Sequence, residues 1–161
     1  MPAQDFGNAF STFIGQNYGA KKTDRIQQGI KSAIKISFLF CLIISVGVFI
    51  FARPLMTIFI DSSETEIINI GVDYLRIEGS FYFGIGILFL LYGFYRAINF
   101  PSMSVILTII SLGTRVGLAY YLASIPSIGV IGIWWSIPIG WALADIFGIV
   151  YYKRKIKQLH F

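Results

Sequence analysis

Hydrophobic residues gather into four long runs that short polar or turn-forming segments separate. The runs cover residues 36–52, 79–95, 103–114 with a continuation past Arg115, and 128–152. Each run approaches the length of about 20 residues with which a helix crosses the roughly 30 Å hydrocarbon core of a bilayer. The pattern predicts an all-α polytopic membrane protein, with residues 1–161 in a single membrane domain. The expected spans are approximately residues 30–52, 74–97, 102–123 and 128–152.

The segment before these runs, residues 6–18, has a helical pattern but is too short to cross a bilayer. It mixes apolar residues with polar ones such as Asn8, Gln16 and Asn17. Polar groups at a helix end inside a membrane need partners, which a neighbouring helix would supply. We therefore interpret the segment as half of a span whose outer half would lie upstream of Met1 in a longer protein. An interfacial helix is the alternative.

Composition agrees with a membrane location. Hydrophobic residues make up 56% of the chain and charged residues 13%, whereas soluble domains contain about 25% charged residues. These proportions exclude most soluble enzyme classes and make the lipid bilayer the first partner of the chain. The single cysteine, Cys41, lies inside an apolar run, where it is expected to pack as a small hydrophobic residue.

Lysine and arginine are unevenly distributed. They lie in residues 21–35, at Arg96 and in the tail from Lys153 to Lys157, whereas residues 53–78 are mostly acidic. If the spans alternate in direction, the three basic regions face one side, which the positive-inside rule assigns to the cytoplasm. We therefore predict a cell-membrane protein with a cytoplasmic C-terminus. Topology and contact with anionic lipid account for the net charge of +5, so no nucleic-acid partner is expected.

Three local signals lie between the first two spans. Pro54 has no backbone N–H and its ring collides with the preceding turn, so it is expected to end the first span. Ser63 and Glu66 fit the S-x-x-E capping box, in which both side chains satisfy backbone N–H groups at a helix start. Asp73 and Arg76 are spaced to pair on the helix that follows.

Two ionisable residues, Arg115 and Asp145, lie inside the runs. At 1.5 Å per residue, Arg115 would be roughly 20 Å and Asp145 roughly 10 Å from the cytoplasmic ends of their spans. This difference in depth disfavours a direct salt bridge between them. One interpretation is a water-filled or substrate-lined cavity. The other is that Arg115 extends toward the interface and Asp145 is hydrogen-bonded between helices.

Other residues have structural and functional interpretations side by side. Gly113 and Gly117 form a G-x-x-x-G pattern, which is typical of close helix packing in membranes. Aromatic residues such as Tyr92 and Trp141 are suited to flat or cationic ligands, and equally to packing against lipid and neighbouring helices.

Signatures of enzymes are lacking. The lone His160 in the basic tail builds no catalytic triad and no histidine-cluster metal site, and no glycine-rich phosphate loop follows a strand pattern. We expect no enzyme, no resident cofactor and no metal ion. A membrane enzyme that depends on Asp145 is the remaining alternative of this class.

Several segments, in order along the chain, resemble transporters of the multidrug and toxic compound extrusion (MATE) family. They are Phe13–Ala20 followed by Arg25, Tyr74–Ile77, Tyr92–Ala97 before Pro101, Thr114–Ala123, and Gly129–Asp145. The residues at family-motif positions within them are Gln16, Gly19, Arg25, Arg96 and Trp141. The resemblance covers nearly the whole chain.

The resemblance implies the C-terminal part of a six-helix transporter lobe, from the end of helix 8 through helix 12. It implies a partner N-terminal lobe, and export of cationic or aromatic compounds by alternating access in exchange for protons or sodium ions. The residues expected to face the cavity are Gln4, Asn8, Ser11, Tyr82 and Tyr92. Some members carry an acidic coupling residue in the helix that corresponds to residues 79–95, where this chain has only Glu78 at the outer edge. The driving ion therefore does not follow from the sequence.

Two other functions remain open at this stage. A lipid-linked oligosaccharide flippase of the same superfamily would need several basic residues facing the cavity to hold pyrophosphate, and only Arg115 is deep enough. A non-transporting membrane scaffold would assemble with partners through its glycine-rich helix faces.

Overall fold

The computed structural model describes residues 1–156, with side chains through Arg154, so Lys157 and His160 lie outside the described residues. The described chain is helical throughout, with no strand, which confirms the all-α fold. The helices are α1 (Pro2–Gly19), α2 (Thr23–Thr57), α3 (Thr65–Ser80), α4 (Tyr82–Ala97), α5 (Pro101–Ala123), α6 (Val130–Tyr151) and the π-helical turn η1 (Tyr152–Ile156).

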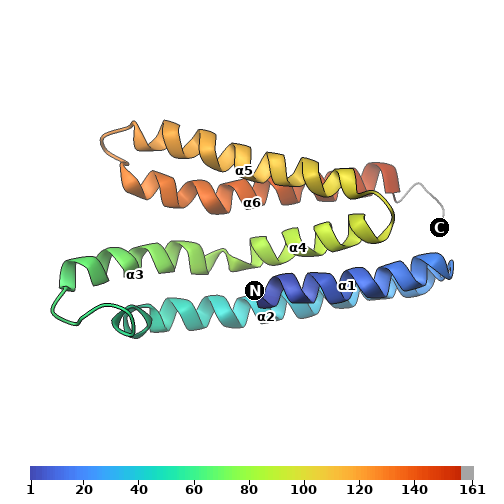
Figure 1. The fold of residues 1–161 in the computed structure, drawn as a ribbon, viewed down its shortest axis with the longest axis horizontal. Helices are drawn as coiled ribbons and strands as arrows, with labels where there is room; N and C mark the ends of the chain where they lie inside the picture. Colours follow the sequence, from blue (N-terminus) through green and yellow to red (C-terminus); the bar gives the residue numbers. More distant parts are fainter. Residues whose placement is uncertain (157–161) are drawn as a thin grey trace.

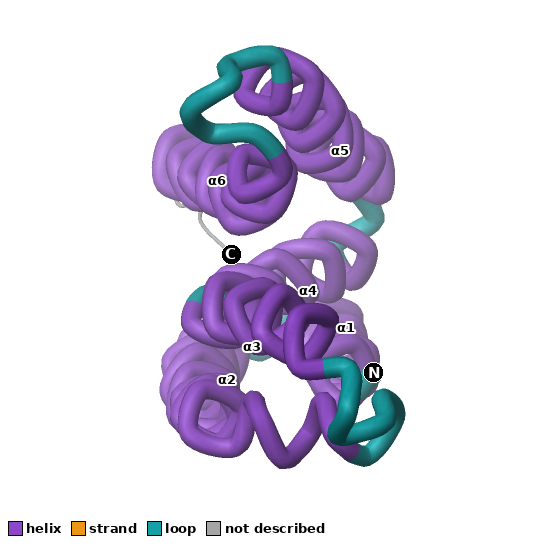
Figure 2. Tube along the Cα trace, turned by 90° about the vertical axis from the view of Figure 1, so that its left-hand side faces the viewer, coloured by secondary structure: helices purple, strands orange, loops and turns teal. Residues whose placement is uncertain are grey.

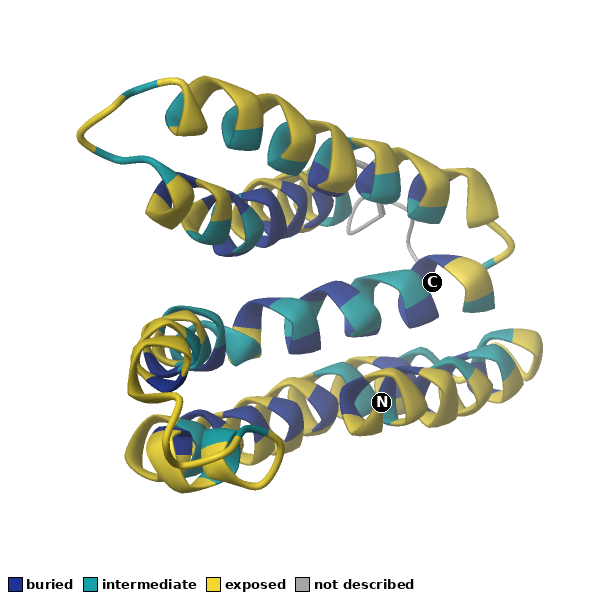
Figure 3. Cartoon of the chain, turned by 60° about the vertical axis from the view of Figure 1, so that its left-hand side comes forward, coloured by how far each residue is buried: buried dark blue, intermediate teal, exposed yellow. Residues whose placement is uncertain are grey.

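The helices form three layers around α4 (Figure 1). The pair α1 and α2 lies on one side, α5 and α6 lie on the other, and α3 and α4 run between them (Figure 2). Helix α4 packs against α1, α2, α5 and α6. Figure 3 shows that α4 is buried or half-buried along most of its length, while the outer faces of the flanking helices are exposed. Such exposed apolar faces are expected of helices that contact lipid.

Three described helices are long and apolar enough to cross a membrane: Thr23–Thr57, Pro101–Ala123 and Val130–Arg154. Helices α3 and α4 together form a fourth candidate span, which bends by 46° at the break between them. The expected span at residues 74–97 is therefore interrupted at Phe81. The expected half-helix at residues 6–18 lies within α1, and the expected span at residues 30–52 lies within the longer α2.

Helices α1 and α4 approach closely because glycines face each other. A Cβ atom on Gly93 would lie 2.5 Å from the carbonyl oxygen of Gly7, and one on Gly7 would lie 2.8 Å from that of Phe89. Any larger side chain at either glycine would have to push the two backbones apart.

The glycines of the predicted G-x-x-x-G contact behave differently. Gly113 and Gly117 are exposed, and a Cβ atom on either would meet no described atom within 4 Å. The prediction that this pattern packs helices is therefore wrong within the described chain. Helix α5 instead meets α6 at Gly140, where a Cβ atom would lie 2.7 Å from the carbonyl oxygen of Ser111.

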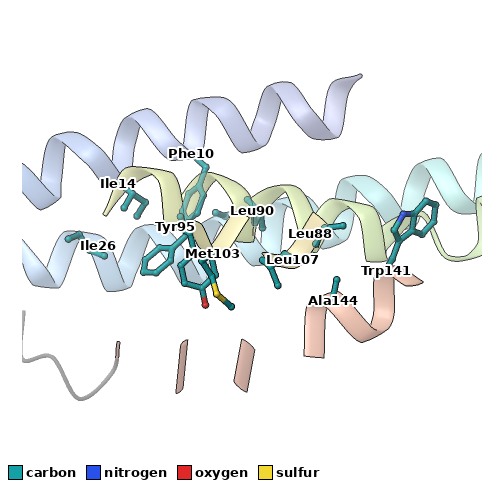
Figure 4. Packing of buried hydrophobic residues seen from close by; sticks show 12 residues of the cluster. Phe10, Ile14, Ile26, Leu88, Leu90, Tyr95, Met103, Leu107, Trp141 and Ala144 are labelled. Atoms are coloured by element: carbon teal, nitrogen blue, oxygen red, sulfur yellow. The ribbon is translucent and has the colours of Figure 1, made fainter. Parts of the chain in front are cut away.

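The largest apolar cluster lies where α4 meets α1, α5 and α6. Tyr95, Met103 and Leu107 are almost completely buried in it and lie together in Figure 4. The Tyr95 hydroxyl donates a 2.7 Å hydrogen bond to the carbonyl oxygen of Gly148, which satisfies its only polar group inside the cluster.

One end of the bundle holds the α1–α2 loop, the α4–α5 loop and the end of α6 (Figure 1). Helices α1 and α4 both terminate there with a residue of positive φ, Lys21 at 56° and Asn99 at 60°. In each case the next residue donates its N–H to the carbonyl five positions back, as in a Schellman motif: Lys22 to Asn17 and Phe100 to Tyr95. The turns bring basic residues of distant segments to one end of the bundle.

The opposite end corrects the local predictions around the α2–α3 connection. Pro54 does not end the first span, because α2 continues through it to Thr57. No side chain caps α3, which begins at Thr65, so the predicted capping box does not form. Ser63 instead donates its backbone N–H and its hydroxyl to Asp61 at 2.9 and 2.8 Å, and these hydrogen bonds lower the pKa of that carboxyl.

Arg76 also differs from the prediction. Its guanidinium lies 5.2 Å from the centre of the Phe49 ring, a cation–π contact between α3 and α2. The described residues contain no ion pair between Arg76 and Asp73. Arg53 of α2 also contacts α3: it donates a 3.0 Å hydrogen bond to the side-chain oxygen of Asn69.

Candidate functional site

A groove of about 390 Å³ opens between α1, α4 and α5. It contains two of the residues that the sequence assigned to a cavity, Gln4 and Tyr92. The full lining is Gln4, Phe89, Tyr92, Arg96, Ser104, Val105 and Thr108. The groove therefore combines two aromatic rings, several neutral polar groups and one cation.

Tyr92 is held firmly at the wall of the groove. Its hydroxyl accepts a 3.1 Å hydrogen bond from Thr108 Oγ1, and its ring meets the Phe89 ring edge-on at 6.1 Å between centres. Ser104 Oγ donates a longer, 3.4 Å bond to its carbonyl oxygen. These contacts fix the two rings as a preformed apolar surface, which is what a flat ligand needs to bind without a large ordering cost.

Arg96 joins α4 to α1 beside this surface. Its Nη2 donates a 2.9 Å hydrogen bond to Asn8 Oδ1, and its Nε donates a 3.3 Å bond to the carbonyl oxygen of Tyr92. The predicted cavity residue Asn8 therefore lies next to the groove, where it orients the guanidinium.

The other two predicted cavity residues lie elsewhere. Ser11 is half-buried between α1 and α4, with its Cβ atom 3.4 Å from the position that a Cβ on Gly93 would take. Tyr82 lines a different pocket of about 490 Å³, together with Glu78 and Trp141. The structure thus brings Gln4, Asn8 and Tyr92 together, while Ser11 does not line the groove and Tyr82 lines another pocket.

The family-motif residues of the first segment lie at the end of the bundle that carries the basic loops. Gln16 is exposed, and its carbonyl oxygen accepts the backbone N–H of Ala20 at 3.1 Å. Gly19 faces open space. Arg25 borders a shallow pocket between α1 and α2. Trp141 is buried on α6, with its Cβ atom 3.4 Å from the position of a Cβ on Gly84.

Arg115 and Asp145 form no ion pair, and the described residues contain only one such pair, at the exposed N-terminus. The stem of Arg115 crosses α6 over Gly140. Its guanidinium interacts electrostatically with Glu78 and Tyr74 of α3. Asp145 is 7% exposed, and its Oδ1 has no hydrogen-bond partner in the described chain. The alternative that Asp145 is hydrogen-bonded between helices is therefore not what the described chain contains.

Comparison with known proteins identifies the family. Residues 1–121, three quarters of the chain, match the MatE family model. The chain belongs to the MatE family.

Curated MatE relatives match almost the whole chain. A multidrug export protein, MepA of Staphylococcus haemolyticus, is 33% identical over 97% of the chain, and a probable multidrug resistance protein, YoeA of Bacillus subtilis, is 25% identical over 99%. A probable multidrug resistance protein, NorM of Thermotoga maritima, is 28% identical over 83%. The chain spans only about a third of these relatives, 29–35% of their length.

Two solved MatE transporter structures share the fold. An inward-facing conformation of a multidrug resistance transporter matches 95% of the chain with a TM-score of 0.86 and 25% identity. An outward-facing conformation matches 96% with a TM-score of 0.88 and 26% identity. The chain covers 35% of each. It is therefore a multi-pass membrane protein of the MatE fold, which confirms the predicted resemblance to this family, the predicted fold class and the predicted membrane location.

Sequence reasoning missed part of the groove of this MatE chain. Phe89, Ser104 and Thr108 were not among the candidates, although Ser104, Thr108 and Ser111 recur at i, i+4 and i+7 on α5. A polar stripe of this period on an apolar helix marks a face turned away from lipid. That signal would have found the α5 wall of the groove.

Proposed function

We propose that this chain supplies the C-terminal part of the second lobe of a multidrug exporter, from the end of helix 8 through helix 12. The exporter would carry cationic or aromatic drugs or metabolites out of the cell by alternating access. Names of the MatE relatives support export as the activity, and the span of about a third of their length makes transport a property of a larger assembly. The remaining lobe is then the main protein partner, and no catalysis is involved.

The groove at Tyr92 carries this proposal. Its two packed rings, Phe89 and Tyr92, form an apolar surface for a flat ligand, and Gln4, Ser104 and Thr108 offer neutral hydrogen-bonding groups beside it. An aromatic pair of this kind stacks on many planar compounds without demanding one shape, which suits a transporter with many substrates.

The match to both conformations supports rigid movement of this part of the transporter. The TM-scores of 0.86 and 0.88 to inward- and outward-facing structures are nearly equal. We infer that alternating access moves this helical unit as a body rather than bending it at Phe81.

The distribution of charge supports a cell-membrane location with a cytoplasmic C-terminus. Lys21 in the loop after α1, Arg96 in the last turn of α4 and Lys153 in the π-helical turn after α6 belong to segments that meet at one end of the bundle. The positive-inside rule assigns that end to the cytoplasm. Export would then be driven by inward flow of protons or sodium ions.

A flippase receives less support. Holding pyrophosphate requires several free cations. Arg115, the basic residue that lies deep in its span, already interacts with the Glu78 carboxyl.

Efflux of ethidium from cells that carry the complete transporter tests the proposal. Tyr92→Ala and Phe89→Ala are expected to lower the efflux rate by about twofold to twelvefold each, because an aromatic contact contributes about 0.5–1.5 kcal/mol. Tyr120→Ala is the matched control, since Tyr120 is 80% exposed on α5 away from the groove. Separate proton and sodium gradients identify the driving ion.

Unchanged efflux in both groove variants at normal membrane levels would overturn the assignment of the groove. Absence of any efflux by the complete protein, together with a defined crosslinked oligomer, would favour the non-transporting scaffold.

A further inference from the structure

Asp145 lies in the interior of the helical unit, on the face of α6 that packs against α4. It is 7% exposed, and the chain itself encloses it. Its neighbour across the interface is Gly84, where a Cβ atom would lie 3.9 Å from Asp145 Oδ2. Gly84 has no side chain, so the α4 residue nearest to the carboxyl offers it no polar group.

The described chain provides nothing that neutralises this carboxyl. Oδ1 is buried without a hydrogen-bond partner, and no ion pair involves Asp145. Among the titratable or charged groups of the packed helices, Tyr74 contacts Trp134 of α6, Tyr95 donates to the Gly148 carbonyl, Arg115 lies against Gly140, and Glu78 interacts with Arg115. Tyr92 interacts electrostatically with Asp145, but a phenol supplies no positive charge.

Glu78 provides an instructive contrast. One of its carboxyl oxygens is also buried without a hydrogen bond, but its side chain is only half-buried and Arg115 interacts with it electrostatically. A cation of the protein thus partly offsets the burial of Glu78. Arg115 is directed to α3, and Asp145 has no equivalent partner.

An acidic residue without a partner is costly inside a membrane protein, and such residues mark ion or proton sites. We propose that Asp145 is the carboxyl of a binding site for a small monovalent cation, a proton or an alkali ion, between α4 and α6. One carboxylate balances one positive charge. The described residues hold no group of three or more His, Cys, Asp or Glu side chains that would suit a polyvalent metal.

The inference deepens the proposed function, since it rests on an exporter driven by cations and gives this chain its own cation site. The site lies close to the groove: Tyr92, which interacts with Asp145, also forms the groove wall. Binding of a cation at Asp145 would therefore be sensed at Tyr92 on the adjacent helix.

Labelling with dicyclohexylcarbodiimide tests the site without any transport measurement. The reagent enters the bilayer and adds to protonated carboxyls in apolar surroundings, leaving a stable N-acylurea that mass spectrometry locates. In membrane vesicles that contain the chain at neutral pH, labelling of Asp145 is expected to exceed that of the exposed Asp73 by about tenfold or more, because exposed aspartates are ionised there. Labelling of Asp145 should fall as the pH rises.

The cation is identified in the same experiment. Protection of Asp145 by sodium chloride but not by choline chloride assigns an alkali ion, and dependence on pH alone assigns the proton. Labelling of Asp145 no stronger than that of Asp73 at every pH would overturn the proposal.

Efflux by the complete transporter separates this inference from the proposed function. If Asp145→Asn is present in the membrane at normal levels but its efflux no longer responds to the ion gradient, the cation site and the proposed function are both supported. Normal labelling of Asp145 in a protein without cation-driven efflux leaves the site intact and overturns the antiport mechanism instead.

Discussion

Both sides of α4 contain polar groups, but these groups are hydrogen-bonded on the groove side and partly unpaired on the α6 side. On the groove side, Tyr92 is bonded to Thr108 and Arg96 is bonded to Asn8. On the α6 side, the Asp145 carboxyl has a buried oxygen with no partner. The two groove-side hydrogen bonds are exposed or part-buried, and both of their partners are satisfied, whereas a buried polar group without a partner lowers stability. The groove side is therefore built for rigidity, and the α6 side retains a group that stability alone does not explain.

The tightest contact of the groove side should give the largest effect. Gly93→Leu places a side chain against the Gly7 carbonyl, so it should lower the free energy of unfolding by about 3 kcal/mol, the upper range for overpacked cores. Unfolding by sodium dodecyl sulfate in mixed micelles measures this change. Gly113→Leu is the matched control: it faces open space and should leave stability unchanged. Equal losses in both variants would contradict the close approach of α1 and α4.

The paired hydroxyl on the α6 side should come next. Tyr95→Phe removes the donor to the Gly148 carbonyl in a fully buried position, and should cost about 1–1.5 kcal/mol. The same unfolding titration measures it, with Tyr121→Phe, which is 66% exposed, as the control. A difference of zero between the two variants would mean that the buried bond contributes nothing.

The sequence predicted the helical membrane fold well because the period and length of apolar runs depend on the bilayer. It misjudged Pro54, because a proline removes only the one hydrogen bond to the carbonyl four residues before it and is tolerated inside membrane helices. It also misjudged Gly113 and Gly117, because a G-x-x-x-G pattern permits close approach without choosing the neighbour. Ser63 does not form its predicted cap: its backbone N–H and its hydroxyl both donate to Asp61, and the N-cap of α3 is Glu64 instead.

The site was harder to predict than the fold. Gln4 and Tyr92 were assigned to one cavity by resemblance, and they share the groove, yet Tyr82, ten residues before Tyr92, lines another pocket. Both tyrosines lie on α4, but ten residues separate them by about 15 Å along the helix and turn them about 80° apart around it. Asp145 lacks a partner because of the way the helices pack, and the spacing of residues along the sequence does not predict that packing.

A smaller effect is expected at the groove wall. Thr108→Val keeps the shape of the side chain but removes the hydroxyl that bonds the Tyr92 hydroxyl and the Ser104 carbonyl, and should lower the free energy of unfolding by about 1 kcal/mol. Combining it with Tyr92→Phe gives a double-mutant cycle that isolates the pair. Strict additivity of the two losses would show that the hydroxyls do not stabilise one another.

Asp145→Asn should have the smallest effect on stability. If the carboxyl had a structural partner, its loss would cost about 1–3 kcal/mol, as for any broken buried hydrogen bond. With no partner for Oδ1, the nearly isosteric amide breaks no hydrogen bond and should leave the free energy of unfolding within about 0.5 kcal/mol of the original. A destabilisation as large as that of Tyr95→Phe would instead assign Asp145 to the architecture. If Asp145→Asn leaves the free energy of unfolding unchanged but abolishes the response of efflux to the ion gradient, Asp145 serves ion binding and not stability. The hydrogen-bonded residues of the groove side should instead change the free energy of unfolding when they are substituted.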